Sequence, residues 1–230
     1  MANSHRQSHT VQLRNSSLVQ LGARAVIDAG VILGYAPSRE VTQRLVIGPS
    51  ARIRQGTIIY GGSYIGRNLE TGHNVIIREQ NLIGDNLCIW SNSIIDYGCK
   101  IGNNVKVHNN VYVAQFTIIE DNVFLAPGVS LANDIHPGCL DATRCLKGPH
   151  IKNGAQVGVN SCILPRVTVG EYALIGAGSV VTRDVPPRGV VYGNPARVVG
   201  TIGDLVCTSG LRDKPYGHLI ERFQDANRVR

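Results

Sequence analysis

Aliphatic side chains recur at every sixth residue along most of this chain. From Val46 onward, the sequence divides into fifteen consecutive six-residue units that end at Ile135, among them VIGPSA, IIYGGS and KIGNNV. The second position is aliphatic in every unit except the one that contains Thr71. A period of six fits neither the 3.6-residue repeat of a helix nor the simple alternation of a strand. The pattern therefore predicts a repeat architecture.

The same register resumes at His150 and continues for six more units to Val185. In each unit, an inward aliphatic residue is accompanied by small residues and by glycine or asparagine. This order predicts a short strand followed by a tight turn. Three such units close one triangular coil, so residues eighteen positions apart are expected to stack in successive coils.

One segment interrupts the repeat between its first and last units. Residues 136–149 read HPGCLDATRCLKGP and belong to no six-residue unit. An insertion of this length must project from the coils, and projecting loops on rigid scaffolds often carry function.

The flanking segments lack the strict period and are expected to cap the ends of the repeat. We therefore divide the chain into a cap with irregular first coils (1–45), a repeat domain (46–200) and a polar tail (201–230). Within the tail, HLIERFQDANR is a candidate short helix.

The composition indicates a folded protein with an aliphatic core, because 43% of the residues are hydrophobic but only 5% are aromatic. The formal charge of +7 suits an anionic ligand such as a phosphorylated cofactor. Scattered basic residues and scarce aromatic residues argue against a nucleic-acid surface. With no apolar signal region and no apolar run of about 18 residues, we expect a cytoplasmic protein without a membrane span. Thiols or metal ligands are then expected rather than disulfides.

The repeat resembles that of the hexapeptide-repeat acyltransferases over roughly residues 46–200. The most specific match is its end, where GAGSVVTRDVP and GNPARV correspond to the family's C-terminal signature. The resemblance implies an all-β fold, a left-handed parallel β-helix with one protruding loop. It also implies a homotrimer with active sites between subunits, and transfer of an acyl group, above all acetyl, from acyl-CoA.

The resemblance also suggests a catalytic base. His136-Pro137 matches, by position and type, the His-Pro pair that supplies the base in the galactoside- and maltose-acetyltransferase branch. Histidine suits this role because it titrates near neutral pH and can take a proton from an attacking amine or hydroxyl. Some nucleotide-sugar N-acetyltransferases of the superfamily need no enzyme base. In that case His136 positions the substrate, and Glu120, Asp121, Asn133 and Asp134 are candidates to orient the amine.

A second group of candidates lies along another edge of the expected prism. Stacking at intervals of eighteen places His73 and Asn109 in one column, and Trp90 and His108 in the adjacent column. In a trimer, this edge and the loop of a neighbouring subunit can meet. One interpretation is a shared site, with a base from one subunit and substrate-binding groups from the next. The other interpretation is a solvated edge.

The cofactor contacts implied by the family lie at the last coils. There, backbone groups contact the pantetheine amides of coenzyme A, and basic residues face its phosphates. The corresponding positions in this sequence are Gly158, Gly176, Ala177, Thr182, Arg183 and Arg197.

The cysteines allow two interpretations. Cys139 and Cys145 lie in the inserted loop and Cys207 lies in the tail, so the three can be free thiols or can form a structural zinc clip between loop and tail. The zinc hypothesis competes with the catalytic hypothesis, because a zinc-bound His136 would not be available as a base.

The preferred function is N-acetylation of an amino group on a nucleotide-linked sugar for cell-surface glycan synthesis. Sugar or small-molecule O-acetylation is the alternative. A metal protein like the γ-class carbonic anhydrases is disfavoured, because His108 has no histidine partner five residues on. A non-catalytic scaffold would not explain the cofactor signature and the loop together.

Overall fold

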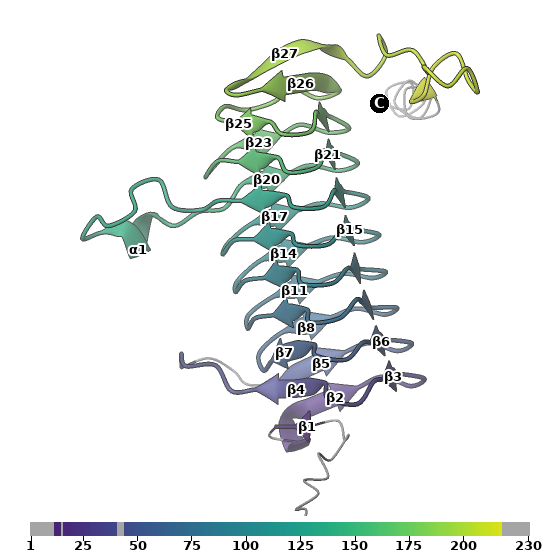
Figure 1. Cartoon of the computed structure of the whole chain (residues 1–230). Coiled ribbons are helices and arrows are strands. Elements are labelled where there is room, and N and C mark those ends of the chain that lie inside the picture. Colours follow the sequence, from purple (N-terminus) through teal and green to yellow (C-terminus); the bar gives the residue numbers. More distant parts are fainter. Residues whose placement is uncertain (1–11, 15, 41–43, 218–230) are drawn as a thin grey trace, which may run out of the picture.

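The computed structural model describes residues 12–14, 16–40 and 44–217, which wind into one tall left-handed parallel β-helix (Figure 1). Three parallel sheets form the faces of the prism, and successive strands of the chain pass from sheet A to sheet B to sheet C. The all-β fold predicted from the six-residue period is thereby confirmed.

The strands are short, as a six-residue unit with a tight turn requires. Sheet A contains β1 (Gln12–Leu13), β4 (Ile32–Tyr35), β7 (Ile58–Tyr60), β10 (Ile76–Ile77), β13 (Ile94–Ile95), β16 (Tyr112–Val113), β19 (Ser130–Leu131), β22 (Cys162–Ile163) and β25 (Val180–Val181). Sheet B contains β2 (Val19–Leu21), β5 (Leu45–Ile47), β8 (Tyr64–Ile65), β11 (Leu82–Ile83), β14 (Lys100–Ile101), β17 (Ile118–Ile119), β20 (His150–Ile151) and β23 (Thr168–Val169). Sheet C contains β3 (Val26–Ile27), β6 (Arg52–Ile53), β9 (Glu70–Thr71), β12 (Cys88–Ile89), β15 (Lys106–Val107), β18 (Phe124–Leu125), β21 (Gln156–Val157), β24 (Leu174–Ile175), β26 (Gly189–Gly193) and β27 (Ala196–Thr201).

Four-residue turns join the faces and stack into three corners of the prism. We call them the AB corner, which includes residues 96–99, the BC corner, which includes 102–105, and the CA corner, which includes 108–111.

The strand register follows the predicted interval of eighteen. Ile77 pairs with Ile95 in the next coil, and the second-position side chains fill the core. Burying one isoleucine side chain contributes about 1.5–3 kcal/mol, so a stack of such residues supplies the main stabilisation. Thr71 is also buried, and its Oγ1 accepts the backbone N–H of Arg54 at 2.9 Å, so the polar exception in the stack is satisfied.

The turns have the left-handed backbone conformation that asparagine and glycine tolerate. Asn104 and Asn122 at the BC corner have φ values of 56° and 59°, and the Asn104 side-chain amide donates to Asn122 Oδ1 at 3.2 Å. Asparagine therefore both closes the turn and links it to the next coil.

The segment before residue 46 forms a wider coil. Val19 on β2 pairs with Leu45 on β5, an interval that exceeds eighteen because the chain leaves the AB corner after β4. A short 3₁₀ helix, η1 (Ser16–Leu18), precedes β2. At the other end, β26 and β27 form an antiparallel hairpin over the last coil. The boundaries of the cap, repeat and tail remain predictions, and the candidate helix at 218–228 lies outside the described residues.

The inserted loop 136–149 also leaves from the AB corner, and it projects from the prism with the short helix α1 (Ala142–Cys145) at its tip (Figure 1). Ile119 pairs with Ile151 across the insertion, so the coils above and below keep their stacking. Within the part of the chain that the structure describes, no helix has the length and apolar character needed to cross a membrane.

Candidate functional site

The loop that carries His136 is fixed at its base. Asp134 Oδ1 accepts the backbone N–H of His136 at 2.9 Å, and the His136 carbonyl accepts the N–H of Cys139 at 3.0 Å. The backbone N–H of Lys147, where the chain returns, donates to the Asn133 carbonyl at 2.9 Å. The two ends of the loop are thus held together at the AB corner, and the His136 side chain is exposed.

A line of polar side chains runs down the AB corner from the base of this loop. Asn133 Nδ2 donates to Gln115 Oε1 at 2.5 Å, and Gln115 Nε2 donates to Asp96 Oδ2 at 2.5 Å. The hydroxyl of Tyr112 also donates to Asp96 Oδ2, at 2.9 Å. Burial, and then the hydrogen bond to Asp96, raise the pKa of Tyr112 to about 12. Tyr112 is therefore a hydrogen-bond donor at neutral pH.

Two arginines and a glutamate continue the line. Arg78 NH1 lies 3.5 Å from Asp96 Oδ1, and Arg78 NH2 donates to Glu79 Oε1 at 3.1 Å. Arg39, from the wide first coil, donates to the same oxygen at 2.7 Å. Burial by itself would raise the pKa of Glu79, but the hydrogen bond from Arg78 and the charges of both arginines outweigh it and lower the pKa. We call these side chains the AB-corner network: Arg39, Arg78, Glu79, Asp96, Tyr112, Gln115 and Asn133.

The sequence interval predicted the columns at the CA corner but not this network. The backbone N–H of His73 donates to Ser91 Oγ at 3.0 Å, and the N–H of Asn110 donates to the Ser91 carbonyl at 3.1 Å, so this column stacks as expected. In the adjacent column, the Trp90 and His108 ring centroids are 6.4 Å apart.

The CA corner and the loop lie at different corners of one chain. His108 packs against Phe124, with ring centroids 4.9 Å apart, while Asn109 and His73 are exposed. A single chain therefore does not bring His108 to His136, and the roles of both remain predictions.

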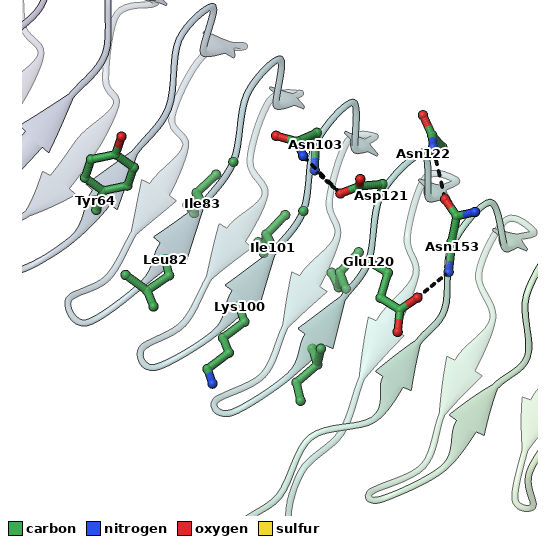
Figure 2. Close-up of a pocket in the computed structure, with 14 residues that line it drawn as sticks. Tyr64, Leu82, Ile83, Lys100, Ile101, Asn103, Glu120, Asp121, Asn122 and Asn153 are labelled. Atoms are coloured by element: carbon green, nitrogen blue, oxygen red, sulfur yellow. Dashed lines mark hydrogen bonds between the residues drawn. The ribbon is translucent and has the colours of Figure 1, made fainter.

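Glu120 lines a broad groove on sheet B and the BC corner (Figure 2), and His150 pairs with it. His150 Nε2 lies 2.7 Å from Glu120 Oε1, and Glu120 Oε2 accepts the N–H of Asn153 at 3.0 Å. The groove has a volume of about 870 Å³, and Leu82 and Lys100 contribute to its wall. Glu120 is one of the sequence candidates for orienting the amine, but its pairing with His150 was not predicted, although the register across the loop places His150 next to Ile118, two residues before Glu120.

The expected cofactor residues fall into two groups. Arg183, after β25, and Arg197, on β27, line one hollow of about 200 Å³ beneath the terminal hairpin. Gly158, Gly176 and Ala177 belong to the CA corner, and Thr182 is exposed next to Arg183.

The two glycines leave no room for side chains. A Cβ on Gly158 would lie 2.7 Å from the Ala177 nitrogen, and one on Gly176 would lie 2.8 Å from the Tyr192 Cβ. Their small size is therefore explained by close packing, with or without a ligand.

The three cysteines of the zinc hypothesis are not brought together. Among residues 12–14, 16–40 and 44–217, no three His, Cys, Asp or Glu side chains form a group that could hold a metal ion. The loop with Cys139 and Cys145 projects at mid-height from one side, whereas the tail with Cys207 follows β27 at the end of the prism (Figure 1). Because the loop and tail leave the prism at different heights, they cannot be joined by the predicted clip in this structure.

Comparison with known proteins identifies the repeat. Residues 82–115, 98–133 and 148–183 match the family described as bacterial transferase hexapeptide (six repeats). The chain thus contains the hexapeptide repeats of bacterial transferases, as the resemblance predicted.

Similar proteins share parts of the sequence or the fold. A 62-residue segment is 52% identical to dTDP-3-amino-3,6-dideoxy-alpha-D-galactopyranose 3-N-acetyltransferase of Aneurinibacillus thermoaerophilus, covering 27% of this chain and 31% of that protein. The match thus spans about a third of that relative's length.

Two solved structures share the fold alone. UDP-N-acetylglucosamine O-acyltransferase of Moraxella catarrhalis RH4 superposes with a TM-score of 0.59 at 20% identity, covering 96% of this chain and 82% of that one. The polySia-specific acetyltransferase NeuO superposes with a TM-score of 0.51 at 18% identity, covering 80% and 81%.

Proposed function

We propose that this protein transfers an acetyl group from acetyl-CoA to the amine of a nucleotide-linked amino sugar used in cell-surface glycan synthesis. The observation that carries the proposal is the 62-residue segment that is 52% identical to a dTDP-amino-sugar N-acetyltransferase. The projecting loop with His136 and the hollow lined by two arginines support it.

In the proposed reaction, the neutral amine attacks the thioester carbonyl, so that a C–N bond forms and the C–S bond breaks. His136 takes the proton that the amine loses, and the departing thiolate is protonated to the thiol. Asn133 and Asp134 orient the amine from the base of the loop. Holding the nucleophile beside the carbonyl lowers the entropic part of the barrier.

We further propose that the active form is a homotrimer. His73, Trp90, His108 and Asn109 at the CA corner of one subunit would then complete the site opened by the loop of the next. Each of these side chains is at least partly exposed in the single chain, which keeps the surface open to a neighbouring subunit.

Coenzyme A would bind at the last coils. Arg183 and Arg197 line the same hollow and carry positive charge suited to its phosphates. Gly158, Gly176, Ala177 and Thr182 would present backbone groups to the pantetheine amides. A hydroxyl of a sugar is the second candidate acceptor, because a histidine base can deprotonate it in the same way.

The test is to incubate the purified protein with acetyl-CoA and dTDP-3-amino-3,6-dideoxygalactose and to measure CoA and acetylated sugar by mass spectrometry. Thiol-reactive dyes are unsuitable, because Cys139 is an exposed free thiol. The matched sugar with a 3-hydroxyl distinguishes N- from O-acetylation. The absence of any acetylated product, together with no acetyl-CoA binding by calorimetry, would favour a non-catalytic scaffold.

A further inference from the structure

Within the AB-corner network, the hydrogen bonds from Asn133 through Gln115 to Asp96 run in one direction, and Asp96 sets it. Asp96 is 6% exposed and receives only donors: the Tyr97 N–H at 2.8 Å on Oδ1, and the Tyr112 hydroxyl and Gln115 amide on Oδ2. The Arg78 guanidinium beside Oδ1 compensates the negative charge. A carboxylate in this setting can only accept hydrogen bonds.

The fixed acceptor at Asp96 determines how the next two amides face. Gln115 must present its NH₂ group to Asp96, so its carbonyl oxygen faces Asn133. Asn133 must in turn present its NH₂ group to Gln115. This orientation follows from the chemistry of the carboxylate and does not depend on how either amide is assigned.

The Asn133 carbonyl oxygen is the last acceptor of the chain. Asn133 is half-buried at the base of the loop, and its Oδ1 receives no hydrogen bond from the residues that the structure describes. The backbone carbonyl of Asn133 also accepts the N–H of Lys147, where the loop returns to the prism. A rigid acceptor atom is thus left available two residues before Ile135 and the loop that follows.

We propose that Asp96 and Gln115 form a polarity relay that holds Asn133 Oδ1 as the hydrogen-bond acceptor for the acyl-accepting group of the substrate. The relay selects an acceptor substrate whose reacting group carries N–H or O–H, and it disfavours a carbonyl or a phosphate oxygen at that point. Asn133 is then a binding residue, and Asp96 and Gln115 are positioning residues. This inference rests on the proposed acetyl transfer.

Reversing the relay tests it. In Asp96→Asn, the Tyr97 N–H and Arg78 hold the new amide oxygen at the Oδ1 position, so its NH₂ group faces Gln115. Gln115 must then turn its amide, and Asn133 presents NH₂ instead of oxygen to the substrate. The expected result is a loss of about 10- to 100-fold in kcat/KM for the amino sugar, with an unchanged Kd for acetyl-CoA.

The double variant Asp96→Asn/Asn133→Asp supplies the rescue. Its carboxylate at position 133 accepts from the turned Gln115 amide and still offers an acceptor oxygen to the substrate. We expect kcat/KM to recover at least tenfold over the single variant. A purely structural role of Asp96 predicts no recovery. Asp85→Asn, which affects a turn carboxylate at the BC corner that accepts the Arg67 N–H, is the matched control and is expected to leave the kinetics unchanged.

The outcomes separate the two proposals. A wild-type protein that acetylates neither the amino sugar nor its hydroxyl analogue would contradict the proposed function. An active wild type with an unaffected Asp96→Asn variant, or a double variant no better than the single one, would overturn the relay. If Asp96→Asn does not fold, as judged by its circular dichroism, Asn133→Asp alone decides. It places a carboxylate against Gln115 Oε1, so the relay predicts at least a tenfold loss, and wild-type kcat/KM would refute it.

Discussion

At the scale of single residues, the position of His136 at the start of the loop distinguishes it, rather than its side-chain contacts. Its backbone is fixed by Asp134, and its side chain extends from a loop held closed at the base. His150, by contrast, is engaged with Glu120. A general base needs an accessible ring held on a rigid support, and the start of the loop provides both.

We therefore expect His136→Ala to reduce kcat by about two to four orders of magnitude while leaving acetyl-CoA binding largely intact. The effect is confined to kcat because the ring acts on the amine proton, whereas the arginines proposed to bind coenzyme A follow β25 and lie on β27. Steady-state kinetics and calorimetric titration with acetyl-CoA measure the two parts. A kcat close to wild type would reject the assignment and direct attention to His108, His73 or attack without an enzyme base.

The AB-corner network contains contacts that the repeat pattern could predict and contacts that it could not. The interval of eighteen places Gln115 directly below Asn133, so that contact was within reach of the repeat pattern. The contact between Arg39 and Glu79 was not, because it depends on the wide first coil, where the period of six does not hold. The contacts between polar side chains along the corner also depend on rotamers, which the repeat does not specify.

At the scale of elements, the six-residue period predicts the strands and the turns correctly because one physical constraint acts at every coil. Each unit buries its second residue and turns at its fifth, where Asn86, Asn92 and Asn104 all have positive φ. Phe116 has the same conformation, with φ of 61°, although a bulky residue disfavours it. Its ring packs edge-on against Tyr97, with centroids 5.3 Å apart, which offsets part of the strain.

By the same logic, we expect the inserted loop to be dispensable for folding. Deleting residues 136–149 joins SLANDI directly to HIKNGA and restores an interval of eighteen between Ile119 and Ile151. Ile135 then takes the sixth position of its unit at the AB corner, which is buried in the neighbouring coils, as at Thr117 and Val167. We expect this variant to show the circular dichroism of the intact protein, and to lose acetyl transfer because His136 is gone.

A scrambled loop of the same length that keeps His136 and Pro137 is the matched control for the deletion. If the deletion variant unfolds or aggregates, the loop contributes to the stability of the prism. Its roles in folding and in acetyl transfer then cannot be separated by this deletion. Retained acetyl transfer without the loop would remove His136 and its surroundings from the site.

At the scale of the whole molecule, one chain holds incomplete halves of the proposed site. His136 and the AB-corner network lie at one corner of the prism, and His108 with its aromatic neighbours lies at another. Rigid stacked coils cannot bring two corners of one prism together, because sheet pairing fixes every coil to the next. The eighteen-residue interval already predicted that the two groups lie at different edges, and the structure confirms this separation, so a second subunit is required if they are to act together.

Subunit mixing tests this arrangement. We expect light scattering to give three times the chain mass of 24.8 kDa. Because each site in such a trimer takes His136 from one subunit and His108 from the next, co-expressed His136→Ala and His108→Ala chains form some sites with both histidines intact. At equal mixing, about a quarter of the sites are complete, so activity should return to about a quarter of wild type.

The control for subunit mixing is the same two variants purified separately and combined without exchange, which should remain as inactive as each alone. Activity in the co-expressed sample that stays at the mean of the two single variants would mean that each site lies within one chain. The corner-to-corner separation then excludes joint action of the two histidines, and His108 would lose its role. Recovery well above that mean can arise only if neighbouring prisms share a site, since neither chain carries both histidines.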